Sequence, residues 1–228
     1  MTEQSTLLPQ RARHVEGVVE RGVDWLFEPY WSGDRLLARL HDGRISLTDA
    51  SGQAVDDAFG EVAGVLAAAL DAEAAVVDGV WTAQPFIGNG QELRRRAQAL
   101  VEDGLVDKPP DPTELETRRA FVAIDLVELD GTSLQQVPYA ERRRLLESVV
   151  QESGRVRISP AVRVPVQPWL DAWRSNGFGF YVAKHANSRY HPGEVAEDWL
   201  VLSSKADPSP APRRRLFGGR RRRAGSSE

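Results

Sequence analysis

The sequence contains no cysteine and only three lysines among its 228 residues. Without cysteine, the chain can form no disulfide, no thiolate metal site and no cysteine nucleophile. The lysines are Lys108, Lys184 and Lys205, so any lysine-dependent chemistry has three candidates, none of them in the first hundred residues. The other basic residues are arginines, which stay protonated in proteins and cannot act as amine nucleophiles.

Long hydrophobic runs and a signal-like N-terminus are also missing. No stretch approaches the length of a membrane span, and Thr2–Gln4 is polar where a secretory signal would be charged and then apolar. Hydrophobic residues make up 41% of the chain and charged residues 27%, which is typical of a folded globular domain. We therefore expect a cytoplasmic protein with no membrane span.

The net charge of −4 is unevenly distributed along the chain. Residues 213–228 carry a net charge of +6, so the rest of the chain carries −10. From residue 206 the sequence is rich in proline, serine and arginine without apolar periodicity, which predicts a disordered tail. Clustered arginines favour salt-sensitive contacts with DNA or with an acidic protein. The candidate binding residues are Arg213, Arg214, Arg215, Arg220, Arg221, Arg222 and Arg223.

The most informative stretch is 25–40, which predicts a strand, a tight turn at Ser32-Gly33 and a second strand. Residues 28–35 read Glu-Pro-Tyr-Trp-Ser-Gly-Asp-Arg. This order resembles motif I of the ATP-dependent DNA ligases, Glu-x-Lys-x-Asp-Gly-x-Arg. Glu28, Gly33 and Arg35 match the motif, whereas Tyr30 stands at the position of the nucleophilic lysine and Ser32 at that of the aspartate.

Two later stretches resemble further motifs of the same family in the same order. Residues 120–147 are similar to the motif III region, with Asp125 at the family aspartate and Ile124 where an aromatic residue covers the adenine. Residues 177–200 are similar to motifs IV and V, Glu-Gly-Val-Val-Ala-Lys and the segments after it, and Lys184 matches the lysine. Four further positions lack the acidic or basic groups of the family, namely Val80, Gly179, Val201 and Ser203.

This resemblance implies an α+β fold with two packed antiparallel sheets, flanked by helices, and a nucleotide cleft between the sheets. We expect an N-terminal lead-in over residues 1–22, a ligase-like adenylation domain over 23–205 and the tail over 206–228. Apolar residues at helical spacing predict an amphipathic helix over 58–70, and a buried strand is expected over 74–81. We also expect a basic-faced helix over 90–104 and a short helix over 168–176 that Gly177 ends. His41-Asp42-Gly43-Arg44 predicts a hairpin turn.

The family's chemistry requires an uncharged amine that attacks the α-phosphate of ATP. A tyrosine could attack only as a phenolate. Free phenols ionise at about pH 10, and nothing near Tyr30 in the sequence favours ionisation at a lower pH. We therefore interpret Tyr30 as part of the pocket floor and assign no catalytic residue. The family uses ATP and magnesium, whereas the substituted positions argue against both here, and the four histidines lack metal-ligand spacing. The resemblance implies remnant cofactor-binding positions at Glu28, Tyr30, Arg35, Asp125 and Lys184.

Three functional hypotheses follow. The chain can be a catalytically degenerate ligase-like protein that serves as a binding or regulatory module, with a link to DNA repair. It can be an active nucleotidyltransferase that relies on non-standard residues or on a partner. It can also be a nucleic-acid accessory protein that acts through its arginine-rich tail. Arg35 faces the nucleotide in the family, and a structural salt bridge is an equally good explanation of its presence.

Overall fold

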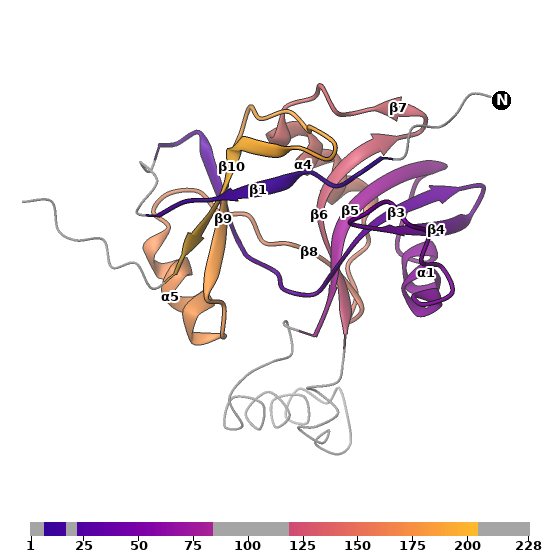
Figure 1. Cartoon of the computed structure of the whole chain (residues 1–228), viewed down its shortest axis with the longest axis horizontal. Coiled ribbons are helices and arrows are strands. Elements are labelled where there is room, and N and C mark those ends of the chain that lie inside the picture. The colour runs from indigo at the N-terminus through magenta and orange to yellow at the C-terminus, as the bar shows by residue number, and fades with distance from the viewer. Residues whose placement is uncertain (1–6, 17–21, 84–118, 205–228) are drawn as a thin grey trace, which may run out of the picture.

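The computed structural model describes residues 7–16, 22–83 and 119–204, and Figure 1 shows their arrangement. The predicted helix over 90–104 and the arginine tail lie outside these ranges. Three helices occur in the described part, and none of them has the length and apolar character of a membrane span. The elements in chain order are β1 Arg11–His14, β2 Trp25–Pro29, β3 Asp34–His41, β4 Arg44–Asp49, α1 Gly60–Ala67, β5 Ala74–Thr82, β6 Ala120–Leu129, β7 Thr132–Ser133, α4 Tyr139–Val149, β8 Val156–Ile158, α5 Gln167–Ser175, β9 Phe180–His185 and β10 Val195–Ser203.

The strands form two sheets, which confirms the predicted α+β class. The first sheet has the order β1-β10-β9-β2, and the second has the order β4-β3-β5-β6-β7 with β8 beside β6. Most neighbours are antiparallel, but β1 pairs with β10 and β8 pairs with β6 in parallel. Both sheets are therefore mixed, each through one short strand that the sequence pattern did not identify as parallel.

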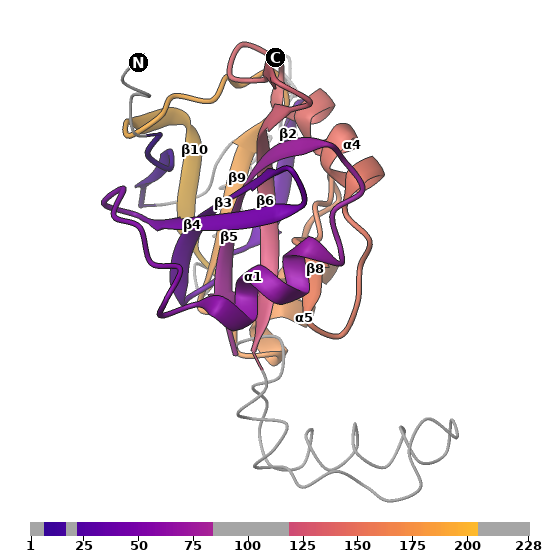
Figure 2. The ribbon, with the colours of Figure 1, turned by 90° about the vertical axis from the view of Figure 1, so that its right-hand side faces the viewer.

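Alternating side chains bind the layers together. In β2, Leu26 packs between the two sheets, whereas Phe27 packs on the outer face of the first sheet with α5. In β3, Leu37 packs between the sheets, whereas Leu36 packs on the outer face of the second sheet with α1. Figures 1 and 2 show α5 beside the first sheet and α1 across the second. This period of two places one face of each sheet toward its partner.

The predicted strand–turn–strand unit of residues 25–40 joins the two sheets. Its strands do not pair with each other, because β2 pairs with β9 and β3 pairs with β4 and β5. Gly33 lies at this crossing, where a Cβ would stand 2.3 Å from the carbonyl oxygen of Trp81. Only glycine permits the backbone to approach β5 so closely. The sequence predicted a tight turn at Ser32-Gly33, whereas the backbone bends at Gly33 and links the two sheets.

The N-terminal segment is part of the first sheet rather than a loose lead-in. Arg11–His14 form β1 beside β10, and Gln10 is completely buried. Gln10 accepts a hydrogen bond from the backbone N–H of His191 through its side-chain oxygen. The sequence of β1 shows no alternation of apolar and polar residues. Its strand conformation depends on pairing with β10, which is distant in the chain. The boundary at residue 22 therefore does not mark where ordered structure begins.

The other predicted elements within the described ranges are present with small shifts. The helix expected over 58–70 is α1, which is shorter, and that expected over 168–176 is α5. The Asp42-Gly43 turn connects β3 and β4 with positive φ angles of 49° and 71°, as its dipeptide predicts. The strand expected over 74–81 is β5 and is buried along almost its whole length.

Gly79→Ala is expected to lower the free energy of unfolding by about 1–3 kcal/mol or more, as judged from overpacked cores. The new Cβ would stand 2.2 Å from the buried ring of Phe121 and 2.8 Å from the carbonyl oxygen of Val122. Urea denaturation of the variant and of the parent chain measures the difference. Gly64→Ala is the matched control, because its Cβ meets nothing within 4 Å in α1 and should stabilise the helix by about 0.5–1 kcal/mol. Equal effects at both positions would contradict this account of β5.

Candidate functional site

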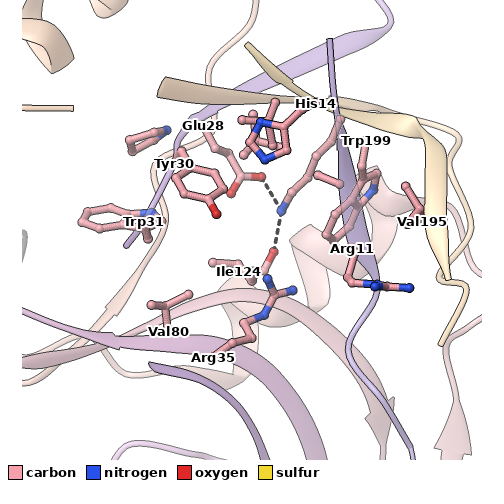
Figure 3. Close-up of a pocket in the computed structure, with 15 residues that line it drawn as sticks. Arg11, His14, Glu28, Tyr30, Trp31, Arg35, Val80, Ile124, Val195 and Trp199 are labelled. Carbon is pink, nitrogen blue, oxygen red and sulfur yellow. Dashed lines mark hydrogen bonds and ion pairs between the residues drawn. The ribbon is translucent and has the colours of Figure 1, made fainter. Parts of the chain in front are cut away.

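A pocket of about 380 Å³ lies between the two sheets. Its walls come from β1, β2, β9 and β10 of the first sheet and from β3, β5 and β6 of the second, as Figure 3 shows in close-up. The apolar part of the lining includes Pro29, Val80, Ile124, Val182, Val195 and Val201. Aromatic and charged side chains complete it, among them Tyr30, Trp31, Trp199, Glu28, Arg35 and Lys184.

Four of the five positions that the resemblance implied therefore lie around one pocket. Glu28 and Tyr30 come from the end of β2 and the residue after it, Arg35 from β3 and Lys184 from β9. Asp125 is the exception, because it is fully buried and absent from the lining. Its neighbour Ile124 faces the pocket instead.

Lys184 and Glu28 form a buried ion pair at the wall of the pocket. Their side chains are 2% and 1% exposed, and Lys184 Nζ lies 2.8 Å from Glu28 Oε1. The same ammonium group donates to the carbonyl oxygen of Ile124 at 2.9 Å and lies 4.2 Å from the ring centre of Trp199. Burial lowers the pKa of Lys184, and the charge of Glu28 opposes that shift. The amine is thus enclosed by partners rather than presented to the cavity.

Tyr139 of α4 supports this pair from the side. Its hydroxyl donates to the carboxylate of Glu28, and its ring centre lies 4.7 Å from the ammonium of Lys184. Burial and the negative charge of Glu28 both raise the pKa of Tyr139 well above its ordinary value, so its hydroxyl stays a donor. Carboxylate, ammonium and phenol therefore form one satisfied polar cluster within the core.

Arg35 forms the second ion pair at the pocket. Its Nε and Nη2 donate to Asp78 Oδ1 and Oδ2 at 2.5 and 2.7 Å, and Tyr190 donates its hydroxyl to Oδ2 at 2.7 Å. Burial by itself would lower the pKa of Arg35, but the charge of Asp78, its hydrogen bonds to Arg35 and the nearby Tyr190 and Asp125 together raise it. Asp78 itself lies within β5, where it is completely buried. Arg35 thus takes part in a structural salt bridge and also lines the pocket.

Asp125 forms a third pair behind the pocket, with Arg142 of α4. Both side chains are completely buried, and Arg142 donates to the two carboxylate oxygens at 2.8 and 2.7 Å. Arg142 also donates to the carbonyl oxygens of Val137 and Ser188, at 2.6 and 3.0 Å. Asp125 therefore holds α4 against β6.

Sequence reasoning missed the partners in these pairs. Asp78, Tyr139, Arg142 and Tyr190 each stand in a segment that was matched to the family, but none was assigned a contact. One signal was available for Arg142, since it occupies the apolar side of α4 with Tyr139 and Leu146. A charged residue on that side requires a buried partner of opposite charge.

Tyr30 has a different environment from the paired residues. It is half-buried, and its ring lies 6.4 Å from that of His14 and 6.3 Å from that of Phe180. In Figure 3 its hydroxyl points toward the middle of the pocket. No hydrogen-bond partner for this hydroxyl occurs among residues 7–16, 22–83 and 119–204. Within the same ranges, no three histidine or acidic side chains come together as metal ligands.

Glu28→Gln is expected to lower the free energy of unfolding by about 3–5 kcal/mol at pH 7, because it leaves the buried Lys184 without its counter-charge. Loss of the carboxylate lowers the pKa of the folded Lys184 further below the ordinary lysine value of 10.5. At a pH between these two pKa values, the unfolded chain binds more protons than the folded chain, so stability rises with pH. The stability deficit should therefore shrink between pH 7 and 10, as measured by urea denaturation. The double variant Glu28→Gln/Lys184→Met should recover most of the loss, and failure to do so would contradict the ion-pair account.

The matching family model is that of the ATP dependent DNA ligase domain, and it matches residues 6–202. The multifunctional non-homologous end joining DNA repair protein LigD of Mycobacterium tuberculosis is 26% identical over 204 residues, which are 87% of this chain and 24% of LigD. The DNA ligase of Thermococcus onnurineus is 25% identical over 208 residues, 86% of this chain and 35% of that protein. This chain thus spans about a quarter to a third of these relatives.

Solved structures show the same fold. A mycobacterial DNA ligase D complexed with ATP and MES superposes with a TM-score of 0.63 and 24% identity, over 86% of this chain and 60% of that one. The Chlorella virus DNA ligase-adenylate superposes with a TM-score of 0.54 and 13% identity, over 87% of this chain and 67% of that one. The fold, the order of the motifs and the family model agree: the chain belongs to the ATP-dependent DNA ligase domain family.

Proposed function

We propose that this domain is a catalytically degenerate member of the family, a binding or regulatory module linked to DNA repair. The observation that carries this proposal is Tyr30, which stands where motif I has its nucleophilic lysine and has a half-buried phenol in place of an amine. Adenylation requires an amine that can attack the α-phosphate, and a phenol provides none. The link to DNA repair rests on the similarity to LigD.

Lys184 is not a substitute for the missing amine. It is the one lysine in the described part of the chain, and its side chain is 2% exposed. Its ammonium group is engaged by Glu28, by the carbonyl oxygen of Ile124 and by the ring of Trp199. An attacking nitrogen needs a free lone pair and access to the phosphate, and this arrangement supplies neither.

The pocket also suits a triphosphate and magnesium poorly. The substituted positions Val80, Ile124 and Val201 all face it with apolar side chains. Glu28, the carboxylate in its lining, is already neutralised by Lys184, so it is a weak candidate for a magnesium ligand. A triphosphate with its several negative charges would find most of the pocket's cations already paired.

No covalent AMP transfer to this chain is expected. The purified protein would be incubated with ATP labelled at the α-phosphate and magnesium, and acid-stable label on the protein would be measured after gel separation. The ligase domain of Mycobacterium tuberculosis LigD, treated identically, is the positive control. Tyr30→Lys should also remain unlabelled, because the acidic and basic groups of motifs IV and V are still missing. Label on the parent chain would overturn the proposal, and label on the variant alone would show that the amine is the one missing part.

Calorimetry should detect no binding of ATP with or without magnesium. The physical reason is that Arg35 and Lys184 are each paired with a carboxylate, so few positive charges remain for the phosphates. A thermal-shift measurement gives an independent test, since a ligand that binds only the folded state must raise the melting temperature. Micromolar ATP binding without covalent transfer would make the domain a nucleotide sensor, contrary to this expectation.

A further inference from the structure

We propose that the pocket between the sheets binds a small aromatic acid, that is, a flat apolar body carrying one negative charge. The inference rests on the proposed function, because it assumes that the pocket no longer serves adenylation. Its starting point is the lining, which is apolar over more than half of its area and in which the ion pairs of Lys184 and Arg35 leave few polar groups to a ligand. That combination is typical of sites that enclose an apolar ligand and orient it through one polar end.

The apolar walls are held in fixed positions. Val80, Ile124 and Val201 come from three different strands of the two sheets, so the walls belong to the rigid part of the fold. Trp31 donates its indole N–H to Ser159 Oγ at 2.9 Å, and Trp199 donates its own to Ser188 Oγ at 3.2 Å. Because its N–H is satisfied by the protein, the half-buried Trp31 offers the pocket hydrocarbon surface, whereas Trp199 is 2% exposed and already carries the ammonium of Lys184 at 4.2 Å from its ring centre. Flat aromatic ligands pack well on such surfaces.

The charges of the lining select a single negative charge. Lys184 is neutralised by Glu28, and Arg35 by Asp78. Arg11 also lines the pocket, and the partner of its guanidinium is the uncharged carbonyl oxygen of Gly193 at 3.2 Å. Among the lysine, arginine and carboxylate side chains of the lining, one positive charge therefore remains uncompensated. A monoanion balances it, and a polyanion would be left with unpaired charge.

Two donors remain free to hold the acidic group. The Tyr30 hydroxyl has no partner within the described residues and points into the pocket (Figure 3). Arg35 uses Nε and Nη2 for Asp78, which leaves its Nη1 without a partner in the same part of the chain, and its side chain is 27% exposed. A hydroxyl and a guanidinium N–H that bind one carboxylate form charge-assisted hydrogen bonds. The substitution that removed the family's nucleophile thereby supplied a ligand donor.

The volume fits the same class of ligand. At about 380 Å³ the pocket is near the lower end of the range for small-molecule sites, which begins at about 300 Å³. The fluorescent probe 8-anilinonaphthalene-1-sulfonate is an aromatic monoanion, and its emission increases in apolar surroundings. Titrating it into the full chain should give saturable binding with one site per chain. Excess 1-naphthoate should displace it, whereas the neutral analogue 1-naphthalenemethanol and ATP should displace it at least about tenfold less effectively.

Two pairs of variants locate the binding. Tyr30→Phe should weaken probe and naphthoate binding about tenfold, whereas Tyr181→Phe should not, because Tyr181 packs on the opposite face of the first sheet. Val195→Glu places a negative charge at the pocket and should also weaken binding, whereas Val23→Glu should not. Both valines are largely exposed, at 49% and 68%, so the folded state should tolerate either change. Circular dichroism checks that each variant is folded.

Three outcomes would overturn the inference: no saturable binding of the probe, equal affinity in Tyr30→Phe or Val195→Glu and the parent chain, or displacement by ATP as effective as by naphthoate. The proposed function is tested separately by AMP transfer. Absence of both label and probe binding would remove this inference alone, whereas label on the parent chain would remove the proposed function as well.

Discussion

The ion pair between Lys184 and Glu28 is the interaction on which the centre of the molecule depends. It joins β9 to β2 in the first sheet, reaches the second sheet through the carbonyl oxygen of Ile124, and reaches α4 through the hydroxyl of Tyr139. Since both charges are almost completely buried, neither can be lost alone without leaving an uncompensated charge in the core. The pocket is formed around this fixed pair.

The other two pairs repeat the same principle at the neighbouring strands. Asp78 holds Arg35 and Tyr190 together, and Asp125 holds Arg142 against β6. Residues that the family resemblance associates with a nucleotide are therefore used here to connect strands, helices and loops. This accounts for the presence of Glu28, Arg35 and Lys184 in a cleft where Val80, Ile124 and Val201 stand at the substituted positions, and of Asp125 behind it. A framework that needs its buried charges for stability keeps them whatever the cleft binds.

The sequence predicted the fold well because its signals were local or came in ordered motifs. The Asp42-Gly43 turn, the buried strand β5 and the helix α5 each followed from short-range pattern. It could not predict β1, because three basic residues and one alanine form a strand only through pairing with β10. It placed four of five candidate residues at one pocket, but could not pair them, because each partner lies in a segment distant in the chain and close only after folding.

The pairing of β1 with β10 has a consequence for synthesis of the chain. The first sheet is made of strands from both ends of the described sequence. β1 and β2 lie before residue 30, and β9 and β10 lie after residue 179. All strands of the second sheet lie between them in the sequence. On the ribosome, β1 and β2 therefore emerge before the strands that pair with them, and the bridge of Phe27 with Val162 is the one earlier backbone pairing of β2 in the described part of the chain. The second sheet can be completed while the earliest part of the chain is still waiting for its partners.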